Sequence, residues 1–356
     1  MDDERYERDL VQLISGSPVQ NNGIALYGTK NYNYALFGEM NLEITSQLKL
    51  TVGYRDIWDS IYYYHNRVST SPVDLPGVRK SFMGGPGSAS KNGYSDRASL
   101  EYTIASDNMI YASYARGYKG PGYDVFFSMQ AFDKLLIAPE TSNDYEIGLK
   151  GRLLDDKLRY SATLFQTDYN NYTASFTDFV AGGFVNRIIN AGTVSTKGLE
   201  LEASWRVTPD LGLNLSSAYD EAKVVQFNCP PGSPISCNIN GKPLPFAPKF
   251  KSHADLNYKH PLNADFDWDV ETAYDWQSAV QYSLAETPDT IQPAFGIWNA
   301  SIGVQSKQGL QLRFLVNNIT DQSYSEALAR GSLGGVVRFV PRNDHRYVGV
   351  TVRQDF

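Results

Sequence analysis

The chain has 356 residues, 42% of them hydrophobic, and its 39 acidic residues outnumber its 32 basic ones, which gives a net charge of −7. Without a basic excess, a general nucleic-acid-binding protein is excluded. The mean hydropathy is −0.36, and no run of about 18 apolar residues occurs, so we expect no membrane-spanning helix. Residues 1–10 lack the apolar core of a signal peptide.

The recurrent pattern along the chain is a period of two. In residues 48–55 and 199–206, for example, apolar side chains alternate with polar ones. Strict alternation is typical of strands with one apolar and one polar face. We therefore expect an all-β antiparallel protein, with residues 4–14 as part of an additional first strand. The other expected strands are 32–44, 48–58, 94–105, 109–118, 142–152, 157–169, 196–206, 211–225, 250–259, 266–281, 295–305, 310–317 and 346–356.

Short and long connections alternate along the chain. Tight turns are expected around 45–47, 106–108, 153–156, 208–210, 260–265 and 306–309. Long segments rich in Gly, Pro, Asn, Ser and Tyr are expected at 59–93, 119–141, 171–195, 226–249, 282–294 and 318–345. This sorting is typical of a transmembrane β-barrel, which has short periplasmic turns and long outer loops. A soluble β-sandwich has no reason to sort its loops.

Strand length and composition agree with a barrel. Most expected strands have about 9–12 residues, which is the length that a tilted strand needs to cross a bilayer. Tyr and Trp gather at strand ends, for example Tyr54, Trp58, Trp205 and Trp276. Such residues favour the membrane–water interface, although cross-strand aromatic packing is an alternative explanation. The polar faces, some fully charged, are then expected to line a wet lumen.

The two cysteines, Cys229 and Cys237, lie eight positions apart in a segment with three prolines. We expect a local disulfide that closes a loop, with two free thiols as the alternative. A disulfide would indicate an oxidising compartment.

Several motifs, in order, resemble the barrel of TonB-dependent outer-membrane receptors. They are residues 111–123 (YASYARGYKGPGY), 139–150 (PETSNDYEIGLK), 190–202 (NAGTVSTKGLELE) and 316–324 (VNNITDQSY), followed by the terminal aromatic Phe356. Phe356 is similar to the outer-membrane assembly signal of that family. The resemblance extends over residues 32–356 and implies a location in the outer membrane of a Gram-negative bacterium.

The resemblance also implies parts that this chain does not match. Members of the family have an N-terminal plug, a TonB-contacting motif and 22 strands. Counted back from Phe356, the chain supplies about 13–14 strands, so we expect the C-terminal portion of a receptor barrel at 32–356, with a partial strand and an outer loop at 1–31. The TonB complex would then act through a plug outside this chain, and the chain alone would not perform energised uptake. The alternative is a self-sufficient barrel of 14 strands.

No catalytic signature, P-loop or zinc motif occurs in the sequence, so we expect neither an enzyme nor a bound cofactor or metal. Asp267, Asp269 and Glu271 alternate on one strand face. We interpret them as lumenal lining balanced by bases on neighbouring strands.

Binding features are expected in the long segments. Aromatic rings together with arginines suit a bulky anionic metal chelate, because rings supply stacking area and guanidinium supplies charge. Self-packing of the loops is the alternative. The candidate substrate-binding residues are Tyr62, Tyr63, Tyr64, Arg116, Tyr118, Tyr123, Phe126, Phe127, Tyr172 and Arg187, with Arg67 as a further cation.

The resemblance implies TonB-energised uptake of a large nutrient, most often a ferric siderophore. A passive porin or hydrophobic-solute channel is the alternative, and a soluble β-protein with an adhesive role fits the sorting of the loops less well.

Overall fold

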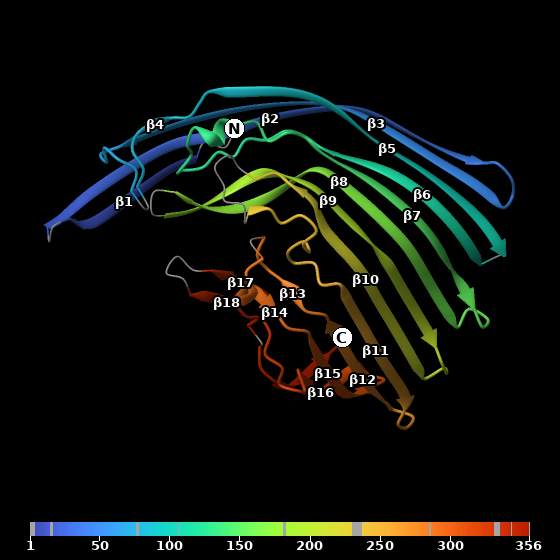
Figure 1. The fold of residues 1–356 in the computed structure, drawn as a ribbon. Coiled ribbons are helices and arrows are strands. Elements are labelled where there is room, and N and C mark those ends of the chain that lie inside the picture. Colours follow the sequence, from blue (N-terminus) through green and yellow to red (C-terminus); the bar gives the residue numbers. More distant parts are fainter. Residues whose placement is uncertain are drawn as a thin grey trace.

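A computed structural model describes residues 4–14, 17–75, 78–105, 107–180, 183–229, 237–284, 286–330, 335–342 and 344–355. Within them, fourteen strands follow one another in a single antiparallel sheet, which curves into an open trough (Figure 1). In spatial order they are β1 (Glu4–Ile14), β2 (Ser17–Glu43), β3 (Leu48–Ser69), β5 (Gly87–Ala105), β6 (Asn108–Lys119), β7 (Glu140–Leu153), β8 (Leu158–Val180), β9 (Gly183–Arg206), β10 (Leu211–Phe227), β11 (Phe250–Pro261), β12 (Phe266–Gln277), β15 (Phe295–Ser306), β16 (Leu310–Asn317) and β19 (Tyr347–Gln354).

Shorter elements lie in the long connections. Strand β4 (Phe82–Met83) pairs with β3, and two small ribbons join β13 (Val280–Gln281) to β14 (Ile291–Gln292) and β17 (Ala327–Arg330) to β18 (Val336–Phe339). The 3₁₀ turns whose bounds lie within the described residues are η1 (Phe132–Lys134) and η3 (Pro288–Thr290). No helix in the described part of the chain is long and apolar enough to cross a membrane.

The all-β antiparallel prediction is confirmed, and so is the additional first strand, because β1 pairs with β2 along its whole length. Strand β2 crosses the boundary expected between residues 31 and 32 without a break. Among the described strands, β1 and β19 end the spatial order and do not pair with each other.

The lengths of several strands were predicted wrongly. Strands β2, β3, β8 and β9 have 27, 22, 23 and 24 residues, so much of the expected long segments 59–93 and 171–195 is strand. Beyond the bilayer both faces of a strand meet water, and the alternation that identifies a strand in the sequence disappears there. Conversely, the strand expected at 266–281 is divided into β12 and β13.

Three of the tight turns share one local mechanism. The Thr45 hydroxyl accepts hydrogen bonds from the Gln47 and Leu48 amides, at 3.2 and 3.0 Å. Thr208 does the same for the amides two and three residues on, and the Asn263 side chain repeats the pattern. A short polar side chain that satisfies the turn amides stabilises a tight connection.

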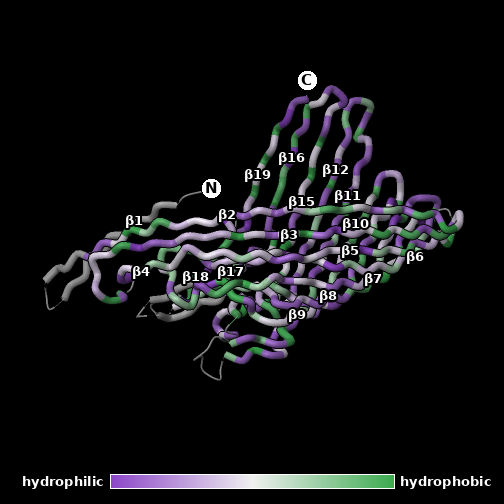
Figure 2. Tube along the Cα trace, turned by 90° about the horizontal axis from the view of Figure 1, so that it is seen from above, coloured by the Kyte–Doolittle hydropathy of each residue, from purple (hydrophilic) through white to green (hydrophobic). Residues whose placement is uncertain are grey.

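The register gives every strand one outward and one inward face. Leu50 pairs with Leu42 and Leu100 on one face, while Lys49 pairs with Glu43 and Glu101 on the other. Hydrophobic and hydrophilic positions alternate along the strands (Figure 2). Large apolar side chains are exposed along the outward face, among them Leu100, Leu164, Ile302 and Val350. This is the pattern of a sheet that meets lipid on one side and water on the other.

Along the outward face, apolar side chains give way to polar ones at the same height on neighbouring strands. Arg116 pairs with Asp96 and Asn143, and Gln166 pairs with Lys197. Arg116 lies eight residues after Asn108, where β6 begins, close to the 9–11 residues that a tilted strand needs to cross a bilayer. This level therefore marks the outer boundary of the hydrocarbon, and everything beyond it is wet.

We predict that the two faces differ in their tolerance of charge. Leu100→Arg places a guanidinium in hydrocarbon and should lower the free energy of unfolding in lipid vesicles by about 2–4 kcal/mol. The matched control is Ser99→Arg on the inward face, which should change it by less than about 1 kcal/mol. Urea titration followed by tryptophan fluorescence measures both, and equal losses would contradict the assignment of faces.

Candidate functional site

The long connections meet at one end of the trough, which we call the outer mouth. The connection between β6 and β7, residues 120–139, is named the strap. Its ends are held together by mutual hydrogen bonds between Gly122 and Ile137, at 3.0 and 2.9 Å. In the sheet, β3 lies two positions before β6 and β9 lies three positions after it. The strap contacts both strands, so it reaches across the mouth.

The first anchor of the strap is Arg67 of β3, whose side chain is 2% exposed. Its guanidinium donates hydrogen bonds to the carbonyls of Phe127 (2.7 Å) and Met129 (3.1 Å) in the strap and of Lys80 (2.9 Å) in the β3–β5 connection. Arg67 lies 19 residues beyond the turn before β3, outside the hydrocarbon. Burial lowers the pKa of Arg67 to about 10, so it stays cationic at neutral pH and its donors remain available.

Apolar contacts accompany this anchor. Phe127 of the strap is buried against Ala25 and Tyr27 of β2. The ring of Tyr63 lies 4.4 Å from the ring of Tyr123, centroid to centroid, and its hydroxyl donates to the Gly84 carbonyl at 3.0 Å. The strap is therefore packed onto the inward faces of β2 and β3.

The second anchor is the buried ion pair between Arg187 of β9 and Asp133 of the strap, at 2.5 Å. Nearby, the Asn190 side chain exchanges two hydrogen bonds with the backbone of Ala138, at 2.6 and 3.0 Å. Asp124 accepts a hydrogen bond from the Ile188 amide at 2.9 Å. Any other position of the strap would separate Asp133 from Arg187 and leave a buried charge uncompensated, which is costly. The ion pair therefore fixes where the strap lies.

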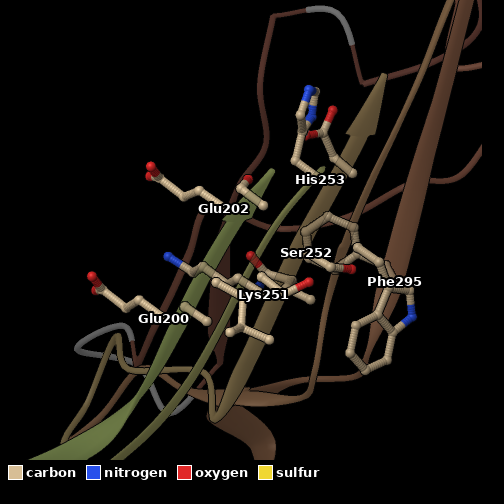
Figure 3. A pocket seen from close by; sticks show the side chains of 13 residues that line it. Glu200, Glu202, Lys251, Ser252, His253 and Phe295 are labelled. Atoms are coloured by element: carbon tan, nitrogen blue, oxygen red, sulfur yellow. The ribbon is translucent and has the colours of Figure 1, made fainter. Parts of the chain in front are cut away.

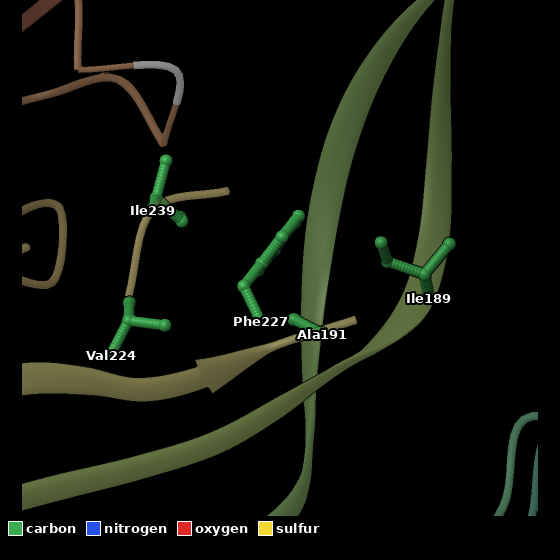
Figure 4. Close-up of a cluster of buried hydrophobic side chains, with 5 residues drawn as sticks. All are labelled: Ile189, Ala191, Val224, Phe227 and Ile239. Carbon is green, nitrogen blue, oxygen red and sulfur yellow. The ribbon is translucent and has the colours of Figure 1, made fainter. Parts of the chain in front are cut away.

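An apolar cluster completes the mouth beside β9. Ile189 and Ala191 of β9 pack with Val224 and Phe227 at the end of β10 and with Ile239 of the following connection (Figure 4). Phe132 of the strap, Tyr172, Ala174, Cys237, Leu244 and Leu284 pack around them. The cluster thus joins four outer segments that are distant in sequence.

The last two outer connections are joined by buried, neutral polar groups. The Tyr282 hydroxyl donates to the Ser325 carbonyl at 2.7 Å, and the Ser325 amide donates to Gln292 at 2.9 Å. Thr290, with no exposed surface, donates to Gln281 at 2.5 Å. The outer connections from β3 to β19 therefore form a folded layer.

The inward wall below the mouth is charged. Arg313 of β16 reaches Asp269 at 2.6 Å and Glu271 at 2.7 Å, and Lys307 pairs with Asp267 at 2.6 Å. These contacts support the interpretation of the three acidic residues as lumenal lining balanced by neighbouring bases. The described residues contain no group of three His, Cys, Asp or Glu that could hold a metal ion.

A hollow of about 450 Å³ opens in this wall between β9, β10, β11 and β12. Figure 3 shows Glu200 and Glu202 of β9 beside Lys251 and His253 of β11. His253 contacts Asp275 at 2.7 Å. The charges of the hollow are thus only partly paired within the wall.

Aromatic rings of the long segments are expected to be exposed, and for Tyr63 and Phe127 this expectation is wrong; the candidate cation Arg187 is buried as well. Tyr63, Phe127 and Arg187 are 2%, 4% and 4% exposed, because the strap packs on Tyr63 and Arg187 and its own Phe127 packs on β2. They belong to the anchors of the strap and the contacts around them. For these three residues, self-packing of the loops is therefore the interpretation that applies.

Three further candidates lie away from the mouth. Tyr62 and Tyr64 alternate with the inward Tyr63 and therefore face outward. Arg116 is at the outer hydrocarbon boundary, with its guanidinium 4.5 Å from the centre of the Tyr94 ring. Tyr118, Tyr123, Phe126 and Tyr172 are half-buried in or beside the mouth, and their contact with a ligand stays a prediction.

Sequence reasoning missed the partners of the two arginines. Asp133 and Met129 lie in a segment without periodicity, and only the strap's contacts reveal their roles. Cys229 and Cys237 are joined as a disulfide, with their Cα atoms 5.9 Å apart. Phe356 lies outside the described residues.

The curved antiparallel sheet with an apolar outward face and a charged inward one defines an outer-membrane barrel wall. The chain belongs to the TonB dependent receptor-like β-barrel family, whose profile matches residues 3–319. Proteins of this family are transporters of the Gram-negative outer membrane, not enzymes.

Individual proteins are similar to the chain at low identity. The pesticin receptor of Yersinia pestis is 22% identical over 315 residues, which cover 85% of this chain and 41% of that protein. The solved ferric yersiniabactin uptake receptor FyuA of Yersinia pestis superposes with a TM-score of 0.75 at 18% identity, over 99% of this chain and 49% of that one. The siderophore receptor PiuA of Acinetobacter baumannii gives 0.65 at 18%, over 94% and 43%. The chain thus spans less than half of each.

We predict that Arg67 holds the strap. Arg67→Met keeps the length and apolar stem of the side chain but leaves the Phe127 and Met129 carbonyls without their donor. The free energy of local opening of the strap should fall by about 2 kcal/mol, and the Met129, Asp133 and Leu135 amides should exchange about 30-fold faster. Hydrogen exchange read by mass spectrometry measures this, with Arg55→Met on the same strand as the control. Unchanged exchange in the strap would show that Arg67 does not anchor it.

We predict that the disulfide between Cys229 and Cys237 forms in the exported protein and stabilises it by about 2–3 kcal/mol, through the unfolded state. Alkylation of the unfolded protein should label no thiol before reduction and two after it. Two labelled thiols without reductant would refute the pairing.

Proposed function

We propose that the protein containing this chain takes up a large solute across the outer membrane, with energy from TonB, and that the solute is a ferric siderophore. Membership in the family supports the reaction class. The ferric yersiniabactin uptake receptor and the siderophore receptor PiuA, which share the fold, support the choice of a ferric chelate. The TonB contact belongs to this proposal for the whole protein.

The observation that carries the proposal is the strap across the mouth. A passive channel needs a permanent opening that is wide enough for its solute. Here a segment pinned by Arg67 on one side and by Arg187 on the other crosses the entrance. A covered, aromatic entrance suits a protein that captures a bulky ligand before a driven step, so it favours a receptor over a diffusion porin.

Accessible aromatics of the mouth are the candidate ligand contacts. Tyr123 and Phe126 lie in the strap and Tyr172 lies in β8, and all three retain part of their surface. An aromatic ring contributes a large contact area at low entropic cost. We therefore assign these rings, and not the buried Tyr63 and Phe127, to the ligand.

The test is uptake of ⁵⁵Fe chelates by a strain without its own siderophore receptors. We expect cells with the receptor to import at least one chelate from a panel of catecholate, phenolate, hydroxamate and citrate chelates. This import should stop when TonB is deleted. Phe126→Ala should weaken binding about tenfold, whereas Tyr62→Ala on the outward face should leave it unchanged. Steady conductance in planar bilayers with TonB-independent passage would replace the proposal with a porin, and uptake of a copper salt alone would replace the siderophore.

A further inference from the structure

A second feature of the mouth is a cavity of about 250 Å³ between the strap and β9. Its walls are mostly apolar and come from both elements. On the strap they are Phe132, Leu135, Leu136 and Ile137, and on β9 they are Ile188 and Ile189. Ile188 and Leu135 are 46% and 62% exposed, so the cavity is open to the outside. Its volume is below that of a drug-sized site and fits one ring with a short arm.

Two carboxylates, Asp124 and Asp133, belong to the lining of this mostly apolar cavity. Asp124 lines the cavity, and one of its oxygens accepts the Ile188 amide at 2.9 Å. The other oxygen accepts no hydrogen bond from the described residues, and no Lys or Arg among them pairs with Asp124. Burial raises the pKa of the Asp124 carboxyl, while the charge of Arg187 opposes that rise. A half-buried carboxylate without a cation is costly unless a ligand supplies one.

Asp133 and Asn190, two other polar residues of the cavity lining, have partners. Asp133 is paired with Arg187, and the Asn190 side chain is occupied by the Ala138 backbone. Cys229 of the disulfide stands at the rim and ties the edge of the cavity to the apolar cluster beside β9. Among the charged groups described around the cavity, Asp124 is thus the one left for a ligand.

We propose that this cavity is a binding site for a compact apolar group that carries a primary ammonium. The apolar part would fill the space between the strap and β9, and the ammonium would donate to the free oxygen of Asp124. A free amine and an amine-bearing arm of a larger solute share this chemistry. The site goes beyond the proposed uptake function, because binding at the outer face needs neither TonB nor transport.

The probes are benzylamine, its neutral analogue benzyl alcohol and the anion benzoate, titrated into the detergent-solubilised chain and followed by saturation-transfer NMR. We expect benzylamine to bind in the millimolar range, as is usual for so small a ligand, and benzoate not to bind. Asp124→Asn keeps the acceptor for the Ile188 amide but removes the charge, and should weaken benzylamine about tenfold without weakening benzyl alcohol. Leu136→Trp, which fills the cavity, should abolish binding of both.

The matched control is Asp265→Asn in the turn between β11 and β12, which should leave all three affinities unchanged. Circular dichroism checks that each variant keeps its strands. Benzylamine that binds Asp124→Asn as well as the wild type, or that does not bind the wild type, would overturn the proposal. Inhibition of ⁵⁵Fe uptake by benzylamine would assign the site to an arm of the imported solute, and binding without inhibition would assign it to a free amine. The benzylamine titration measures binding without transport. It therefore tests the amine site even if the uptake proposal fails.

Discussion

Hydrogen-bond pairing of the backbone between neighbouring strands, at a register that sets which side chains face lipid, is the constraint on which the rest of this structure depends. Hydrocarbon offers no hydrogen bonds, so a strand can cross it only with neighbours on both sides. With a side-chain period of two, a slip of one residue would exchange the lipid and lumen faces. The uninterrupted pairing of Leu50 with Leu42 and Leu100 keeps the two faces apart.

Above the membrane, water can satisfy backbone groups, so strand pairing is no longer required there. The chain is held by side-chain contacts instead. Strands β2, β3, β8 and β9 continue with both faces wet, and they carry the anchors of the strap. The anchors are buried cations: Arg67 with three backbone carbonyls and Arg187 with Asp133. Such groups are satisfied in one geometry only, so they fix the strap more specifically than apolar packing would. The three carbonyls around Arg67 and the carboxylate of Asp133 beside Arg187 offset the cost of removing these cations from water.

The contrast between the two regions explains what could be predicted from the sequence. Within the hydrocarbon, alternation identified the strands and their faces, because lipid imposes that pattern on the residues. Outside it, the continuation of β3 from Asp59 to Ser69 could not be seen, since tyrosines and polar residues there follow no period. Tyr63 and Arg187 lie at the mouth, but both are buried there. Their burial depends on the strap, whose contacts with β3 and β9 are long-range and leave no trace in spacing.

The separation of lipid and lumen faces, with its outer limit at Arg116 and Asn143, can be measured directly. Nitroxide labels placed singly along β7, from Tyr145 to Leu153, would be tested for relaxation by oxygen, which concentrates in lipid, and by a water-soluble nickel chelate. The account predicts that oxygen accessibility peaks at 145, 147 and 149 and falls at 146, 148 and 150, with the chelate showing the opposite order. Accessibility without a period of two along these positions would contradict it.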